Sequence, residues 1–140
     1  MPQIKAVCFD FGGVTELPGA LFQKKLNHEL SDWLPGLKQQ RFKIGLLSNY
    51  NIDLTSKLKK YNILEFFDVV ISSFEIEYEK PDPRAFNILF ERLDVLPREV
   101  IFIDDSEKSL ETASQIGYHP ILFRSNEQLK TELQKFGIVL

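Results

Sequence analysis

Short apolar runs that alternate with helix-like segments are the feature that most constrains this fold. Five runs have the length and apolar content of buried strands: IKAVCF (4–9), KIGLLS (43–48), DVVISS (68–73), VIFIDD (100–105) and PILF (120–123). A strand that is buried on both faces carries an almost continuous apolar run, which is typical of a parallel sheet. Alternation of such strands with helices therefore predicts an α/β fold with helices on both faces of one parallel sheet.

The helical segments are indicated by apolar residues at a spacing of three and four. The clearest stripe lies at 86–93, and weaker ones lie at 54–61, 110–117 and 129–136. Asp82 followed by Pro83 predicts a helix start, because an aspartate caps a helix well and proline suits its first turn. Ser125 with Gln128 three residues later predicts a capping box at the start of the last helix.

The stretch from residue 16 to residue 40 is less regular. Its apolar residues follow a helical spacing that predicts one helix: Phe22, Leu26, Leu30 and Trp33. We expect that helix to break at Pro35 and Gly36, since proline disrupts a helix interior. Nothing in this stretch indicates a second domain, so we expect residues 1–140 to form a single domain.

Charge and cysteine content narrow the classes of function. The chain has 140 residues, a formal net charge of -3 and no basic run, which argues against a nucleic-acid partner. One cysteine cannot form an internal disulfide, as is usual in a reducing compartment. The first residues, MPQIKAVCFDFGG, are too short and too charged for a signal peptide or a membrane span. We therefore expect a cytoplasmic protein with no membrane partner.

Charged and polar side chains follow four of the five predicted strands. In chain order, the residues at or after these strand ends are Asp10, Ser48, Asn49, Lys80, Asp104 and Asp105. In parallel α/β sheets, ligands bind beyond the carboxyl ends of the strands. Each residue alone is compatible with a turn, a helix cap or a solvated surface. Their shared position at one sheet edge predicts a functional site.

The chemistry of these side chains points to a metal and a phosphoryl group. Three carboxylates that lie close together repel one another unless a cation sits among them, and Mg²⁺ prefers such oxygen ligands. An aspartate can attack phosphorus and form an aspartyl-phosphate. The charge on the phosphoryl group then needs an ammonium and a hydroxyl, which Lys80 and Ser48 supply.

Four motifs in this order resemble the haloacid dehalogenase-like (HAD) hydrolases, and specifically their phosphatase branch. The motifs are FDFGGVT, LLSN, EKPDPRAF and FIDDSEKSLETASQIG, and the resemblance covers nearly all of residues 1–125. It implies a Rossmann-like three-layer sandwich with five parallel strands in the order 5-4-1-2-3. It also implies a Mg²⁺-dependent phosphomonoester phosphatase that acts through an aspartyl-phosphate.

By matching position, the resemblance implies a role for each residue at the strand ends. Asp10 is the expected nucleophile, and Lys80 is expected to steady it together with the phosphate. The expected Mg²⁺ ligands are carboxylates and one backbone carbonyl: Asp10, Gly12, Asp104 and Asp105. The expected substrate-binding groups are Ser48, Asn49 and Lys80.

The chain departs from the family pattern in two places. Most phosphatases of this family carry a second aspartate two residues after the nucleophile, as a general acid and base, and here that position is Gly12. The family also often inserts a cap domain between the first two motifs, whereas residues 16–40 have room for only about one or two helices. We therefore expect a missing or vestigial cap.

These departures leave three functions open. The first is a phosphatase that acts on a phosphorylated small molecule or on an exposed phosphate of a macromolecule, with a second copy of the chain as a candidate cover for the open site. The second is a catalytically impaired binding or regulatory protein. The third is a haloacid dehalogenase, which also lacks the second aspartate but relies on cap residues to hold its substrate.

Overall fold

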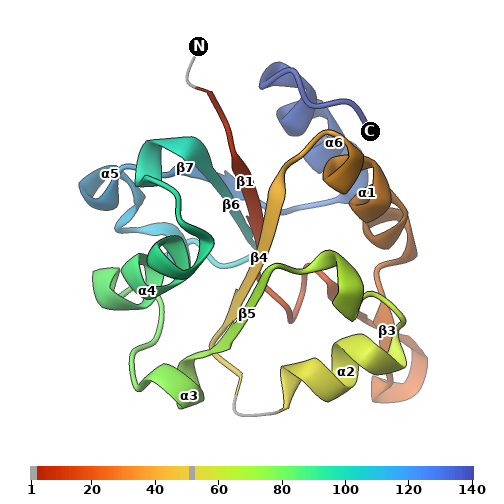
Figure 1. The fold of residues 1–140 in the computed structure, drawn as a ribbon. Coiled ribbons are helices and arrows are strands. Elements are labelled where there is room, and N and C mark those ends of the chain that lie inside the picture. Colours follow the sequence, from red (N-terminus) through yellow and green to blue (C-terminus); the bar gives the residue numbers. More distant parts are fainter. Residues whose placement is uncertain (1–2, 51–52) are drawn as a thin grey trace.

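The computed structural model describes residues 3–50 and 53–140, and its centre is a five-stranded parallel sheet (Figure 1). The strands of this sheet are β1 (Ala6–Phe9), β4 (Lys43–Ser48), β5 (Val69–Ser72), β6 (Val100–Asp104) and β7 (His119–Leu122). They lie in the order β5-β4-β1-β6-β7. Because β2 and β3 belong to a separate hairpin, these five strands counted along the chain have the predicted order 5-4-1-2-3, read from the other edge. The predicted fold class is confirmed.

Helices cover both faces of the sheet, which gives three layers (Figure 1). One face carries α1 (His28–Gln39), α2 (Leu54–Lys60) and α6 (Asn126–Lys135). The other face carries α3 (Ser73–Ile76), α4 (Pro83–Leu93) and α5 (Ala113–Ile116). Short 3-10 turns lie at Ala20–Phe22, Leu64–Phe66, Pro97–Glu99 and Lys108–Leu110. Within the described ranges, no helix has the length and apolar character to cross a membrane.

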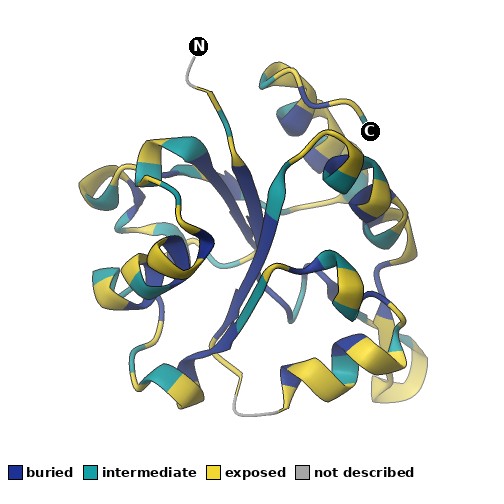
Figure 2. Ribbon diagram, in the orientation of Figure 1, coloured by how far each residue is buried: buried dark blue, intermediate teal, exposed yellow. Residues whose placement is uncertain are grey.

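Two hydrophobic clusters hold the layers together, one on each face of the sheet. Val7 and Phe9 of β1 join the cluster under α1 and α6, whereas Ala6 and Cys8 join the cluster under α4. This alternation follows from the two-residue period of a strand. All four side chains are fully buried, and Figure 2 shows the middle of the central sheet buried between the helices, where every residue of β1 and β6 is buried. Cys8 is thus a small core residue.

The predicted helix starts at Asp82 and Ser125 are confirmed. The Asp82 side chain accepts a hydrogen bond from the backbone N–H two residues later, at 2.9 Å, and caps α4. The Ser125 hydroxyl accepts a hydrogen bond from the N–H of Gln128 at 3.1 Å and caps α6. The Gln128 side chain accepts from the N–H of Arg124 at 3.1 Å, so it closes the cap one residue earlier than a capping box requires.

The helix predicted from Phe22 is wrong, because a hairpin occupies the first part of that stretch. Strands β2 (Glu16–Pro18) and β3 (Lys24–Leu26) pair antiparallel, and the turn between them places Phe22 at a φ of 65°. Asn27 then caps α1 by accepting a hydrogen bond from the N–H of Leu30 at 3.3 Å. The helical spacing of the apolar residues therefore continues across a change of secondary structure.

The predicted break at Pro35 is also wrong, since α1 continues through it to Gln39. Proline in a helix interior costs about 3 kcal/mol. Its neighbours Leu34 and Leu37 are fully buried against the sheet, and burying such a side chain stabilises the fold by roughly 1.5–3 kcal/mol. Pro35 itself is exposed to solvent. Packing of the inner face therefore outweighs the lost hydrogen bond on the outer face.

Candidate active site

The residues predicted from the strand ends lie together at the carboxyl edge of the sheet. They line one cavity of about 220 Å³. The predicted residues found there are Asp10, Gly12, Ser48, Asn49, Lys80, Asp104 and Asp105. Asp10 directly follows β1, while Ser48 and Asp104 are the last residues of β4 and β6. The structure thus brings the residues together, while their chemical roles stay predictions.

Lys80 lies between two carboxylates in the floor of this site. Its Nζ is 2.9 Å from Oδ1 of Asp10 and 2.6 Å from Oδ2 of Asp104. The Lys80 side chain is only 1% exposed, and Asp104 is equally buried. Charges so deeply buried are stable only when they are paired and hydrogen-bonded. Lys80 therefore holds the nucleophile candidate Asp10 in one place and one orientation.

The amide of Asn49 fixes the backbone of Lys80. The Lys80 N–H donates to Oδ1 of Asn49 at 2.9 Å, and Nδ2 of Asn49 donates to the Lys80 carbonyl at 3.0 Å. These two bonds join the end of β4 to the loop that carries the ammonium. The observed contacts of Asn49 are thus with Lys80, and a contact between Asn49 and substrate stays a prediction.

Three carboxylates form a cluster that suits a divalent cation. Asp10, Asp104 and Asp105 each offer an oxygen, and these oxygens all lie within 4.8 Å of one another. Burial is the largest cause that raises the pKa of Asp10 to about 7, and the nearby Asp104 carboxylate raises it further, against the effect of Lys80. Burial also raises the pKa of Asp105. Hard oxygen ligands in this arrangement fit Mg²⁺, whose positive charge would favour the ionised carboxylates.

Gly13, the second of the two glycines that follow Asp10, makes room for Asp105. Its φ is 83°, a conformation that glycine adopts far more easily than other residues. A Cβ on residue 13 would lie 2.1 Å from Oδ2 of Asp105. The carboxylate thus passes directly against the backbone of the turn after Asp10. The paired glycines that follow the aspartate were the available sequence signal for this close approach.

The hydroxyl of Ser48 is placed to donate into the cavity. Ser48 is fully buried at the end of β4, and its Oγ accepts a hydrogen bond from the N–H of Tyr50 at 3.2 Å. Because that bond uses a lone pair of the oxygen, the hydroxyl proton remains available to a ligand. A phosphoryl oxygen is a suitable acceptor for it.

Tyr50 also lines the cavity and was missed by the sequence reasoning. Its ring lies where a side chain at position 12 would begin. A Cβ on Gly12 would stand 2.6 Å from Cε2 and 3.2 Å from the hydroxyl oxygen of Tyr50. The place of a second acidic side chain is therefore filled by an aromatic ring. No sequence pattern connects positions 12 and 50, so only the fold reveals this contact.

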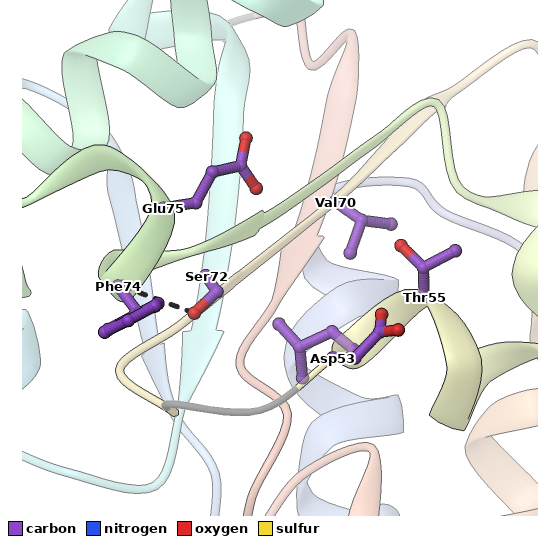
Figure 3. Close-up of a pocket in the computed structure, with 7 residues that line it drawn as sticks. Asp53, Thr55, Val70, Ser72, Phe74 and Glu75 are labelled. Carbon is purple, nitrogen blue, oxygen red and sulfur yellow. Dashed lines mark hydrogen bonds between the residues drawn. The ribbon is translucent and has the colours of Figure 1, made fainter.

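A second cavity, of about 320 Å³, lies at the start of α2 and the end of β5 (Figure 3). It is lined by Asp53, Leu54, Thr55, Val70, Ser72, Phe74 and Glu75. None of the clustered carboxylates belongs to it, and the Asp53 carboxylate caps α2 by accepting a hydrogen bond from the N–H of Ser56. The smaller cavity at the strand ends is therefore the candidate active site.

The fold and these groups define an α/β protein with a cluster of charged side chains at the carboxyl edge of its parallel sheet. The chain belongs to the haloacid dehalogenase-like hydrolase family, whose model matches residues 22–123. It is 29% identical over 98 residues to a phosphorylated carbohydrates phosphatase of Thermotoga maritima, covering 69% of this chain and 45% of that protein. It is 36% identical over 101 residues to (S)-2-haloacid dehalogenase 1 of a Pseudomonas species, covering 67% of this chain and 44% of that protein.

A solved structure shares the fold. A HAD family enzyme of Bacteroides thetaiotaomicron, in complex with magnesium and inorganic phosphate, matches with a TM-score of 0.73 and 19% identity over 88% of this chain and 96% of that chain. By contrast, the chain spans less than half of the two curated relatives described above. Family membership as a hydrolase is therefore shown, whereas reaction and substrate need a separate argument.

Proposed function

We propose that this chain is a Mg²⁺-dependent phosphomonoester phosphatase that acts through an aspartyl-phosphate on Asp10. The observation that carries this proposal is the position of Lys80 Nζ, at 2.9 Å from Asp10 and 2.6 Å from Asp104, beside a cluster of three carboxylates. The phosphatase relative and the magnesium and phosphate complex of the structural neighbour support it. The phosphatase relative is similar to this chain over 45% of its own length, and the structural neighbour is similar in fold.

The reaction has two steps. In the first, a carboxylate oxygen of Asp10 forms a bond to phosphorus, the bond to the ester oxygen breaks, and the leaving alkoxide takes up a proton from water to become the alcohol. In the second, water attacks the aspartyl-phosphate, which releases inorganic phosphate and regenerates the carboxylate. Lys80 orients Asp10 through its ion pair, and the Ser48 hydroxyl donates to a phosphoryl oxygen.

Mg²⁺ fits the carboxylates Asp10, Asp104 and Asp105 and, by the family resemblance, the carbonyl of Gly12. When bound, it supplies positive charge that offsets the charge of the transferring phosphoryl group. The residues of the chain then have the task of holding the ester in line with Asp10. The reduced segment between β1 and β4 leaves the cavity open to substrates of varied size.

A phosphatase assay with Asp10→Asn tests the proposal. The variant keeps the shape of the side chain but removes the attacking charge, so we expect loss of nearly all Mg²⁺-dependent phosphate release from 4-nitrophenyl phosphate. Asp32→Asn, a matched change of an exposed aspartate on α1, should leave the rate unchanged. In the wild type, Mg²⁺ at 100 times its dissociation constant should stabilise the fold by about 2.7 kcal/mol and raise the melting temperature.

Wild-type rates in Asp10→Asn, or phosphate trapped on another residue, would contradict the role of Asp10. Absence of turnover together with a Mg²⁺-dependent shift of the melting temperature would favour a binding or regulatory protein that has kept the metal site. That alternative arises from Gly12, which brings no acidic side chain to the cavity.

Dehalogenation is a second candidate because a haloacid dehalogenase is the relative with 36% identity. The reaction would use the same Asp10 to displace halide from carbon. It makes no use of a three-carboxylate cation site, and a departing halide gains nothing from nearby carboxylates. Halide release from (S)-2-chloropropionate, measured with and without EDTA, separates the two reactions. Metal-independent release would favour dehalogenation.

A further inference from the structure

We propose that the Tyr50 hydroxyl donates a hydrogen bond to the leaving oxygen of the ester, in the place that a side chain at position 12 would otherwise occupy. The inference rests on the proposed phosphatase reaction and adds to it a catalytic residue. It starts from the geometry at Gly12, where the hydroxyl oxygen of Tyr50 lies 3.2 Å from the position of an added Cβ.

Two side-chain donors of the cavity are already engaged by other residues of the site. Lys80 Nζ pairs with Asp10 and Asp104, and the amide of Asn49 is bonded to the Lys80 backbone. Among the residues that the structure describes, the Tyr50 hydroxyl makes no hydrogen bond, although it lines the cavity. A phenolic hydroxyl is both a donor and an acceptor, so it can serve a developing alkoxide.

The backbone of Tyr50 is held in place by hydrogen bonds at its N–H and at its carbonyl. Its N–H donates to Oγ of Ser48 at 3.2 Å, and its carbonyl accepts a hydrogen bond from the hydroxyl of Ser72. Ser72 ends β5 and also accepts from the N–H of Phe74 at 3.3 Å, as Figure 3 shows. Two strand ends therefore fix the backbone that carries the ring.

Tyr50 is partly exposed, at 36%, and one aromatic contact orients its ring. Its centroid lies 6.1 Å from that of Phe11, and the two rings are nearly perpendicular, at 87°. Edge-on pairs of this kind stabilise one orientation of a ring. The ring edge with Cε2 and the hydroxyl lies beside Gly12, which has no side chain to compete with it. A donor that is already oriented stabilises a transition state without further reorganisation.

The consequence is a dependence on the leaving group. An alkoxide is strongly basic and needs a hydrogen bond as it departs, whereas a nitrophenolate spreads its charge over the ring. Removing one donor of this type lowers kcat by about 10²–10³-fold. We therefore expect Tyr50→Phe to lower kcat for alkyl phosphates by about 10²-fold and to change KM and the rate for 4-nitrophenyl phosphate only slightly.

The experiment compares a series of aryl and alkyl phosphates in wild type, Tyr50→Phe and Tyr118→Phe. The control is matched because the Tyr118 hydroxyl is buried among aromatic rings, without a hydrogen-bond partner in the described part of the chain, and lies outside the cavity. Both variants keep their rings and should fold. Tyr118→Phe should show the wild-type series, and Tyr50→Phe should show a steeper decline toward basic leaving groups.

A swap sharpens the test. Gly12→Asp alone should not gain activity, because its Cβ would meet Cε2 of Tyr50 at 2.6 Å. Gly12→Asp combined with Tyr50→Ala removes that ring and offers a carboxyl group instead. We expect the double variant to hydrolyse alkyl phosphates faster than Tyr50→Ala alone.

Binding of orthovanadate provides a readout that does not require turnover, because its five-coordinate form has an oxygen at the leaving position. We expect Tyr50→Phe to weaken vanadate binding about tenfold and to leave the affinity for inorganic phosphate nearly unchanged. An unchanged leaving-group series, an equal loss for all esters, or unchanged vanadate affinity would overturn the role of Tyr50. If the wild type hydrolyses no phosphate ester, the proposed function fails, and vanadate affinity alone then decides whether the hydroxyl faces the in-line position.

Discussion

The carboxyl edge of the sheet and the tip of the β2–β3 hairpin are stabilised in opposite ways. At the edge, Lys80 is 4% exposed and has a charged partner on two sides. At the tip, Leu21 and Phe22 are 88% and 101% exposed. The site is therefore held by charged partners on buried side chains, whereas the tip carries its apolar side chains into solvent on a short turn.

The two regions differ in how much a mutation is expected to cost. A buried ion pair holds reacting groups in one geometry, and the loss of one partner is costly. An exposed loop tolerates change with little effect on stability. In this chain the tightly bonded part is the carboxyl edge with the candidate site, and the exposed part is the hairpin tip in the segment between β1 and β4.

The largest expected effect comes from breaking the ion pairs of the edge. Lys80→Met leaves the buried carboxylates of Asp10 and Asp104 without their cation. We expect the free energy of unfolding to fall by about 3–5 kcal/mol and phosphate release to be lost. Urea unfolding in the absence of divalent cations measures the first effect.

The matched control is Lys38→Met. The Nζ of Lys38 lies 2.6 Å from Asp68, but both side chains are about one-third exposed. Solvent screens this pair, so we expect a change of less than about 1 kcal/mol. Equal losses of unfolding free energy in the two variants would show that the ion pairs of Lys80 stabilise the fold no more than the exposed ion pair of Lys38.

The next effect concerns the turn after Asp10. Gly13→Ala introduces a side chain at a φ of 83° and places its Cβ 2.1 Å from Oδ2 of Asp105. We expect a loss of about 1–3 kcal/mol from backbone strain and a reduced Mg²⁺-dependent rise in melting temperature, because the carboxylate must move. Thermal unfolding with and without Mg²⁺ separates the two contributions.

Gly36→Ala is the control for this change. A Cβ there would meet no atom within 4 Å, and the residue lies inside α1. We expect a gain of about 0.5–1 kcal/mol and an unaltered response to Mg²⁺. A Gly13→Ala protein that responds to Mg²⁺ as fully as the wild type would remove Asp105 from the proposed ligands.

The same contrast explains how much the sequence predicted. The sheet and its cavity were predictable because buried parallel strands carry apolar runs, and the groups that bind ligands follow the strand ends. Asp10 and Lys80 are 70 positions apart, yet each could be placed from its own strand. Such local signals add up to a site once the topology is known.

The remaining features depend on contacts that no local signal carries. The stripe through Phe22 and Leu26 has a helical period, yet the chain forms a hairpin there because Asn27 begins the helix later. The proximity of Tyr50 to Gly12 depends on the packing of two strand ends. The helix through Pro35 depends on burial of its opposite face.

The smallest expected effect concerns the tip of the β2–β3 hairpin. The base of the hairpin is held by hydrogen bonds of a buried side chain, whereas the tip is exposed. At the base, the buried carboxylate of Glu16 accepts a hydrogen bond from Lys57 Nζ at 2.8 Å and one from the Tyr61 hydroxyl at 2.6 Å. Glu16→Gln should lower the free energy of unfolding by about 1–3 kcal/mol, because it removes charge from a buried and bonded group. The double change Leu21→Ser, Phe22→Ser should alter it by less than about 0.5 kcal/mol.

Turnover and molecular mass of the double variant test whether the exposed tip has a further role. If the exposed apolar pair only ends a turn, the double variant should hydrolyse 4-nitrophenyl phosphate at the wild-type rate and sediment with the same mass. A dimer of the wild type that dissociates in the double variant would instead show that Leu21 and Phe22 lie at an interface between two copies. Because both side chains are almost fully exposed in the single chain, dissociation with unchanged folding stability would assign their apolar surface to contact between chains.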